Sequence, residues 1–138
     1  FRRVLFRSNY YGTPLLSVQN LLKQGKDVIL EIEVEGAKKV INQFPECISI
    51  FIMPPSMDIL ISRLKERGSE DSVTISNRIF KAKNELKDSY KYKYVIINDD
   101  LQKSVDDVLK VIEVSNMQTY KMKHIIDEVL NNEITVSR

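Results

Sequence analysis

The sequence predicts an α/β protein in which helices flank a three-layer parallel sheet. Three short runs rich in β-branched residues are expected to form strands, at 28–33, 48–53 and 94–97. Their apolar residues are nearly continuous, as is typical of parallel strands covered on both faces. Segments with helical spacing separate these runs, and alternation of strand and helix favours a layered sheet with right-handed crossovers.

Five segments carry apolar residues at helical spacing. These residues span 15–22, 37–44, 59–64, 75–86 and 101–112. The first helix is expected to begin at Pro14 and to end at Gly25, and Pro45 is expected to close the second. Ser56 is expected to cap the third helix and Asp99 or Asp100 the fifth, because short polar side chains accept hydrogen bonds from unpaired backbone N–H groups.

Two regions do not fit this alternation. Residues 67–74, RGSEDSVT, are polar and have no apolar period, so we expect an exposed, mobile connection there. Beyond Asn116 the periodicity is weaker and the chain ends in NNEITVSR, which we expect to fray.

Composition bounds the class of protein. The chain has 138 residues, which fits one compact domain, and its net charge of +2 gives no indication of a nucleic-acid or membrane partner. No apolar run approaches the ~20 residues that span a bilayer. A single cysteine, Cys47, excludes an intramolecular disulfide, so we expect a reducing, cytoplasmic compartment.

Polar residues at expected strand ends are the first candidates for a site, because parallel sheets bind ligands at the carboxyl ends of their strands. Glu31 and Glu33 are two apart, so they are expected to share one face of a strand. A ligand role and a salt bridge or solvated strand end fit them equally well.

Two further clusters have a functional and a structural interpretation. Arg63, Arg67 and Arg78 suit polyphosphate because guanidinium groups donate paired hydrogen bonds and keep their charge. Spacing alone favours a solvated basic helix face. The segment 9–14, NYYGTP, offers hydroxyl groups and an aromatic face to a planar base, although its pattern alone favours a packed corner.

Several common sites are excluded by the sequence. His124 is the single histidine, so a Ser-His-Asp or Cys-His catalytic arrangement is not available. The usual zinc sites need cysteine and histidine clusters, which the sequence does not contain. It also contains no G-x-x-x-x-G-K-[ST] phosphate loop.

Taken in order, six motifs resemble the guanylate kinase family from Asn9 to about Ile112. They are NYYGTP at 9–14, VILEIEVEGA at 28–37, FIMPPS at 51–56, RLKERG at 63–68, SNRI at 76–79 and VIINDDL at 95–101. The resemblance implies a fold of the P-loop nucleoside-monophosphate-kinase type that is truncated at its N-terminus. The family's phosphate loop, and the arginines and glutamate that hold GMP, are then expected upstream of the sequence given.

The resemblance also implies an activity and a role for each matching residue. The family transfers a phosphoryl group from ATP to GMP with Mg²⁺. Tyr11 matches a tyrosine that contacts the GMP phosphate, and Thr13 and Glu33 match residues that contact guanine. Glu31 is expected to contact Mg²⁺ through water. The family's lid arginines, which surround ATP and the transferring phosphoryl group, are matched by Arg63, Arg67 and Arg78. The residue at the family's adenine site is matched by Asn98.

The same resemblance divides the chain. Residues 1–8 do not resemble the family and are expected to be foreign sequence. A remnant of the GMP-binding subdomain is expected at 9–13, the α/β core at 14–66, the lid at 67–78, and the rest of the core with a C-terminal helix at 79–138.

Two functions remain to be compared, and the oligomeric state is open. The first is an ATP-dependent guanylate kinase in purine nucleotide metabolism, whose 138-residue part is expected to be inactive alone. The alternative is a non-catalytic, guanylate-kinase-like module that binds peptides. The three lid arginines and Asn98 favour the enzyme.

Overall fold

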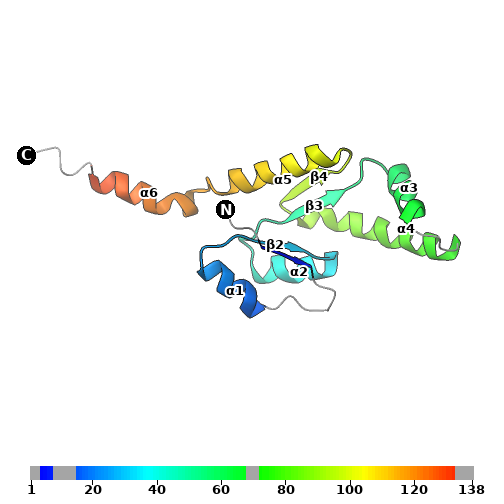
Figure 1. Cartoon of the computed structure of the whole chain (residues 1–138), viewed down its shortest axis with the longest axis horizontal. Coiled ribbons are helices and arrows are strands. Elements are labelled where there is room, and N and C mark those ends of the chain that lie inside the picture. The colour runs from blue at the N-terminus through cyan, green and yellow to red at the C-terminus, as the bar shows by residue number, and fades with distance from the viewer. Residues whose placement is uncertain (1–3, 8–14, 68–71, 133–138) are drawn as a thin grey trace, which may run out of the picture. The chain divides into compact units, whose positions relative to one another are not determined.

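A computed structural model describes residues 4–7, 15–67 and 72–132. The chain divides into two compact units, an N-terminal unit of residues 1–47 and a C-terminal unit of residues 48–138 (Figure 1). Each unit combines helices with one pair of parallel strands. The α/β class predicted from the sequence is therefore confirmed. The described strands form two two-stranded pairs, and a single three-layer sheet is not among the described features.

In the N-terminal unit, β1 (Val4–Arg7) pairs in parallel with β2 (Val28–Glu31). Helix α1 (Leu15–Lys23) comes between them in the sequence and packs on β2. Helix α2 (Val34–Gln43) follows β2. Strand β1 was not expected, because basic residues flank its three apolar residues and mask a very short apolar run.

The predicted ends of both helices in this unit are confirmed. Gly25 follows α1 with a positive φ of 71°, a conformation that glycine adopts without steric cost, and its N–H donates to Leu22 O at 2.9 Å. Helix α2 ends at Gln43, two residues before Pro45, which cannot donate a backbone hydrogen bond.

The prediction that Glu31 and Glu33 share a strand face is wrong. Strand β2 ends at Glu31, and Glu33 is already the N-cap residue of α2, with φ −67° and ψ 162°. The first helical bond runs from Ala37 N–H to Glu33 O at 2.9 Å, so the chain turns into the helix before a further strand residue can form. Strand alternation therefore does not extend from Glu31 to Glu33.

In the C-terminal unit, β3 (Ile50–Met53) pairs in parallel with β4 (Tyr94–Ile97), in the register Ile50 with Tyr94 to Met53 with Ile97. Between them the chain forms α3 (Met57–Arg67), α4 (Ser72–Lys87) and the 3₁₀ turn η1 (Asp88–Lys91). Helix α3 packs on α4, and α5 (Leu101–Ser115) packs on β4. Helix α6 (Thr119–Asn132) ends the described part of the unit.

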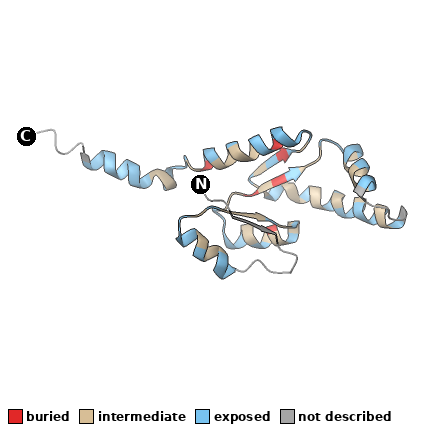
Figure 2. Cartoon of the chain, in the orientation of Figure 1, coloured by how far each residue is buried: buried red, intermediate tan, exposed pale blue. Residues whose placement is uncertain are grey.

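The best-buried positions of the C-terminal unit gather on its two strands and on α5 (Figure 2). Phe51 of β3 and Ile96 of β4 are buried, and the ring of Phe51 meets Tyr92 edge-on, with centroids 5.1 Å apart. Buried Ser49 accepts a hydrogen bond from Lys93 N at 2.9 Å, which aligns the starts of the two strands. Such edge-on aromatic pairs add ~1 kcal/mol beyond the area they bury.

The predicted N-caps are confirmed in this unit. Ser56 Oγ accepts from Ile59 N at 3.2 Å at the start of α3. Asp100 Oδ1 accepts from Lys103 N at 2.7 Å at the start of α5. Both side chains satisfy backbone N–H groups that the first helical turn leaves unpaired.

Several boundaries in the C-terminal unit differ from the prediction. Strand β3 begins at Ile50 rather than at residue 48, and Arg67, expected in the connection, is the last residue of α3. Helix α4 begins at Ser72, so residues 72–74 are helical although they were expected in the mobile connection. Ser72 and Thr74 are polar, and the one apolar residue between them, Val73, does not establish a helical period by itself. Residues 119–132 form α6, although the periodicity beyond Asn116 is weaker, and five apolar residues at helical spacing explain the helix: Met122, Ile125, Ile126, Val129 and Leu130. Of the segment NNEITVSR, which was expected to fray, residues 131–132 are helical and 133–138 lie outside the described residues. In the part of the chain that the structure describes, no helix is long and apolar enough to cross a bilayer.

Candidate functional site

The carboxyl end of the β3–β4 pair holds the best-defined candidate residue, Asn98. It directly follows β4, and its backbone N–H donates to Met53 O at 2.7 Å. This bond extends the parallel ladder by one residue beyond Ile97. The backbone of Asn98 is therefore held by β3, and its half-buried side chain projects from this fixed position.

Arg63 reaches the same residue from α3. Its Nη1 atom donates to Asn98 O at 2.9 Å, across 35 residues of sequence, in a partly buried contact. Hydrogen bonds that involve a charged group contribute ~1.5 to 3 kcal/mol. The structure thus brings together two residues that the sequence analysis assigned separately to the ATP site.

Ser104 completes this cluster and was not predicted. It lies one turn into α5 and is 6% exposed, and its Oγ lies 2.7 Å from Asp100 O and 3.3 Å from Asn98 Oδ1. The sequence feature that could have identified Ser104 is its position four residues after the capping Asp100. This spacing places the serine hydroxyl near the end of β4. Serine is common enough in helices that this spacing alone is not informative.

The other two predicted arginines lie on α3 and α4. Arg67 is the last residue of α3, one turn after Arg63, and the position of its side chain is outside the described part of the chain. Arg78 lies on α4 and is exposed. Because α3 packs on α4, the three arginines belong to two helices that are in contact.

The predicted GMP residues belong to the N-terminal unit. Glu31 and Glu33 are exposed at and just beyond the carboxyl end of β2. Although Glu33 is the N-cap residue of α2, its side chain makes no capping hydrogen bond there. Tyr11 and Thr13 lie outside the described residues.

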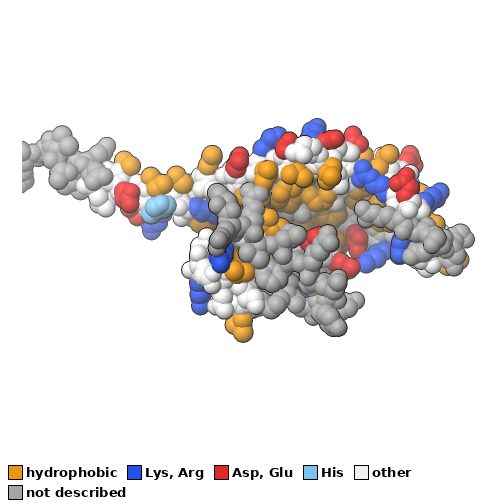
Figure 3. All heavy atoms as spheres, viewed as in Figure 1, with side chains coloured by type: hydrophobic (Ala, Val, Ile, Leu, Met, Phe, Trp, Pro, Cys, Tyr) orange, Lys and Arg blue, Asp and Glu red, His pale blue; other side chains and the backbone are white. Residues whose placement is uncertain are grey.

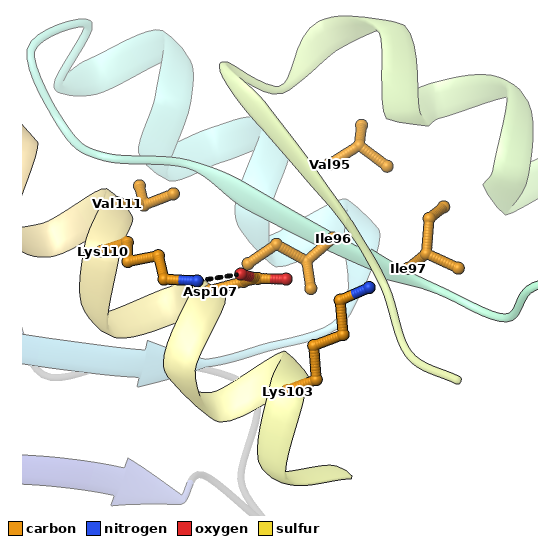
Figure 4. A pocket seen from close by; sticks show the side chains of 7 residues that line it. All are labelled: Val95, Ile96, Ile97, Lys103, Asp107, Lys110 and Val111. Atoms are coloured by element: carbon orange, nitrogen blue, oxygen red, sulfur yellow. Dashed lines mark hydrogen bonds and ion pairs between the residues drawn. The ribbon is translucent and has the colours of Figure 1, made fainter. Parts of the chain in front are cut away.

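A pocket of about 430 Å³ lies between β4 and α5 (Figure 4). Its floor is apolar, formed by Val95, Ile96, Ile97 and Val111, and Lys103, Asp107 and Lys110 stand at its edge. Lys110 Nζ donates to Asp107 Oδ1 at 3.0 Å, and this bond, more than the attraction of the charges, raises the pKa of Lys110.

The pocket is separate from the predicted site residues, because neither Arg63 nor Asn98 lines it. Charged side chains follow the outward side of α5 in the space-filling view, while apolar ones are exposed beside the strands (Figure 3). Among the residues that the structure describes, no three His, Cys, Asp or Glu side chains are placed to hold a metal ion.

The fold and the site define an α/β protein with polar residues at the carboxyl ends of parallel strands, where such proteins bind their ligands. An amide, an arginine and a buried hydroxyl meet at the end of β4, and two carboxylates stand at the end of β2.

Comparison with known proteins gives the family. A family model described as guanylate kinase matches residues 3–115, which is most of the chain. The chain is 41% identical to a guanylate kinase of Neisseria gonorrhoeae over 124 residues, 90% of this chain, and 44% identical to that of Prochlorococcus marinus over 108 residues, 78% of this chain. The chain therefore belongs to the guanylate kinase family.

A solved structure agrees with this assignment. The crystal structure of guanylate kinase from Anaplasma phagocytophilum matches 75% of this chain and 48% of its own chain, with a TM-score of 0.61 and 28% identity. The chain spans 60% of the Neisseria gonorrhoeae relative and 59% of the Prochlorococcus marinus relative. The family match ends at residue 115, so α6 lies beyond it.

Proposed function

We propose that this chain forms part of a guanylate kinase that converts ATP and GMP to ADP and GDP in purine nucleotide metabolism, in the cytoplasm. The family match over residues 3–115 carries the proposal. The contact between Arg63 and Asn98 supports it, because it joins a cationic group to the residue assigned to adenine. The fold of this proposal is a three-layer parallel sheet with flanking helices, of the P-loop nucleoside-monophosphate-kinase type.

The proposed reaction needs no nucleophilic side chain. An oxygen of the GMP phosphate attacks the γ-phosphorus of ATP, the bond from that phosphorus to the ADP oxygen breaks, and ADP leaves. Negative charge is spread over the transferring group, so the protein acts by positioning and by electrostatic stabilisation. Arg63, Arg67 and Arg78 are proposed to supply this positive charge.

The acceptor site is proposed to use residues of the N-terminal unit. Guanine presents N–H donors and a carbonyl acceptor, so the carboxylate of Glu33 and the hydroxyl of Thr13 are suited to bind it. The hydroxyl of Tyr11 is proposed to donate a hydrogen bond to an oxygen of the GMP phosphate.

A magnesium ion would arrive with ATP and neutralise the phosphate oxygens. Mg²⁺ prefers oxygen ligands and keeps several waters, so the exposed carboxylate of Glu31 fits a contact through water.

The 138 residues do not supply every part of this site. The sequence contains no G-x-x-x-x-G-K-[ST] segment, whose backbone N–H groups would hold the ATP phosphates. We therefore expect negligible turnover from the 138-residue chain alone. Turnover close to that of the full-length relatives would contradict this expectation.

A chimera tests the proposed function directly. The N-terminal segment of the Neisseria gonorrhoeae guanylate kinase, up to the position that matches Asn9, is joined to residues 9–138 of this chain. A coupled assay should show transfer from ATP to GMP, and little to AMP or UMP. The 138-residue chain and the isolated Neisseria segment are the controls. A folded chimera that binds nucleotide without turnover would contradict the proposal and favour a binding module.

A further inference from the structure

The hydroxyl of Ser104 lies close to three oxygens but has one proton. Its Oγ is 2.7 Å from Asp100 O, 3.3 Å from Asn98 Oδ1 and 3.4 Å from Ile97 O. A serine hydroxyl donates once and accepts through its lone pairs. The shortest contact is to Asp100 O, four residues earlier on the same helix, and a hydroxyl in this position commonly donates there. The proton is therefore used by Asp100 O.

This assignment decides how the Asn98 amide faces Ser104. With Oδ1 at 3.3 Å, two oxygens would meet without a proton between them. A half-turn of the amide exchanges its oxygen and nitrogen, and the hydrogen-bond partners determine which orientation holds. With the nitrogen toward Ser104, Nδ2–H donates to Oγ. Within the described residues nothing else bonds the amide nitrogen, so this orientation satisfies both groups.

The backbone of Asn98 leaves little other freedom. Its N–H is bonded to Met53 of β3 and its carbonyl to Arg63 of α3. With both backbone groups held, the amide orientation depends on the side chain that it meets. That side chain is Ser104, which is 6% exposed and belongs to α5.

We propose that Ser104 is a positioning residue that turns the amide oxygen of Asn98 outward, where it accepts a hydrogen bond from the 6-amino group of adenine. The inference rests on the proposed function, in which Asn98 lies at the adenine site. Adenine presents an N–H donor at ring position 6, whereas guanine and hypoxanthine present a carbonyl oxygen there. An outward Oδ1 accepts from the amino group and repels the carbonyl. Ser104 thereby sets the preference of the donor site for ATP.

Two variants serve as controls on α5. Ser115 is 1% exposed and donates to Ile112 O at 2.7 Å, so Ser115→Ala also removes a buried helix hydroxyl, at a distance from Asn98. Ser104→Thr retains the hydroxyl. If Ser104→Ala acted only by weakening α5, Ser115→Ala would have the same effect.

The orientation of the amide is tested on the 138-residue chain without nucleotide. In ¹⁵N-edited NMR, one Asn98 side-chain amide proton should show a nuclear Overhauser effect to the Ser104 β-protons. It should also exchange about fivefold more slowly than the amide protons of exposed Asn131, because one hydrogen bond protects it. The nuclear Overhauser effect and the slowed exchange should both persist in Ser115→Ala and disappear in Ser104→Ala. Wild-type Asn98 protons that exchange as fast as those of Asn131, with no such effect, would overturn the assignment.

The specificity role is tested in the chimera with ATP and inosine triphosphate, whose base has a carbonyl at position 6. Ser104→Ala should lower the ratio of kcat/KM for ATP over inosine triphosphate about five- to tenfold, the range that one lost hydrogen bond explains. Ser104→Thr and Ser115→Ala should retain the ratio. An unchanged ratio in Ser104→Ala would overturn the specificity role. A chimera with no transfer would contradict the proposed function, while the NMR result would still decide the amide orientation.

Discussion

Two residues separate α2 from the end of β2 and three separate α5 from the end of β4, yet the N-cap residues of the two helices behave differently. Asp100 accepts a hydrogen bond from Lys103 N and so holds the first turn of α5. Glu33 occupies the same position in α2, but its side chain makes no capping bond. Glutamate is a poor cap because its longer side chain loses more freedom when it folds back on its own helix.

The difference in capping distinguishes Asp100, a carboxylate with a structural role, from Glu33, a candidate for a functional role. Asp100 stabilises the start of α5, and Ser104 of that helix contacts Asn98. The role of Asp100 is therefore structural and does not require contact with a ligand. Glu33 lies at a cap position without capping, so helix capping does not explain a carboxylate there. The comparison predicts that the two residues affect different measurements.

The largest expected effect comes from a residue outside both helix starts. In the chimera, Arg78→Ala should lower kcat about a hundredfold while the affinity for GMP changes little, because a lost charge contact in the transition state costs ~3 kcal/mol. Steady-state and single-turnover kinetics measure it. Lys83→Ala, which removes another exposed cation from α4, is the matched control. If kcat held and thermal stability alone fell, Arg78 would be a structural residue.

Glu33→Gln should have the next largest effect, and it should be confined to GMP. Losing a charged hydrogen bond to guanine corresponds to ~1.5 kcal/mol or more, or about tenfold weaker binding of GMP, with ATP binding unchanged. Isothermal titration of the chimera with each nucleotide measures this. Glu35→Gln is the control, because Glu35 is an exposed carboxylate of α2 paired with Lys38. Equal losses for both nucleotides would indicate general damage and contradict the assignment to guanine.

Asp100→Ala should have the smallest effect, and on stability. Loss of the capping bond should lower the free energy of unfolding of the 138-residue chain by about 1 kcal/mol. Denaturant titration followed by circular dichroism measures the difference. Asp99→Ala removes the neighbouring charge but leaves the cap, so it should cost less. Equal losses from the two variants would show that charge, and not capping, stabilises the start of α5.

Local signals in the sequence located much of the fold. The strand at 94–97 and the caps Ser56 and Asp100 depend on residues within a few positions of one another, and each is confirmed. Gly25 and Pro45 limit the backbone by their own chemistry, which no distant contact needs to supply. The helix starts at Val34 and Ser72 were missed because the first turns, VEGA and SVTI, mix apolar residues with polar residues or glycine and show no clear helical period.

Contacts between residues far apart in the sequence could not be predicted from the local pattern of residues. Strand β1 is defined by its pairing with β2, more than 20 residues away in the sequence. The bond from Arg63 to Asn98 spans 35 residues, and spacing alone had favoured a solvated arginine. Such contacts depend on how helices and strands pack, which is a property of the assembled unit.

The sequence by itself determined the α/β class, the confirmed helix caps and ends, and, through six motifs, the guanylate kinase family. It did so because propensity, capping and turn chemistry act over a few residues and leave a readable pattern. The tertiary structure alone decided that Glu31 and Glu33 do not share a strand face, and that Asn98 is held by Met53 and Arg63 and meets Ser104. Those facts depend on where one strand ends and on which side chains meet across the fold, and the order of residues does not encode either one locally.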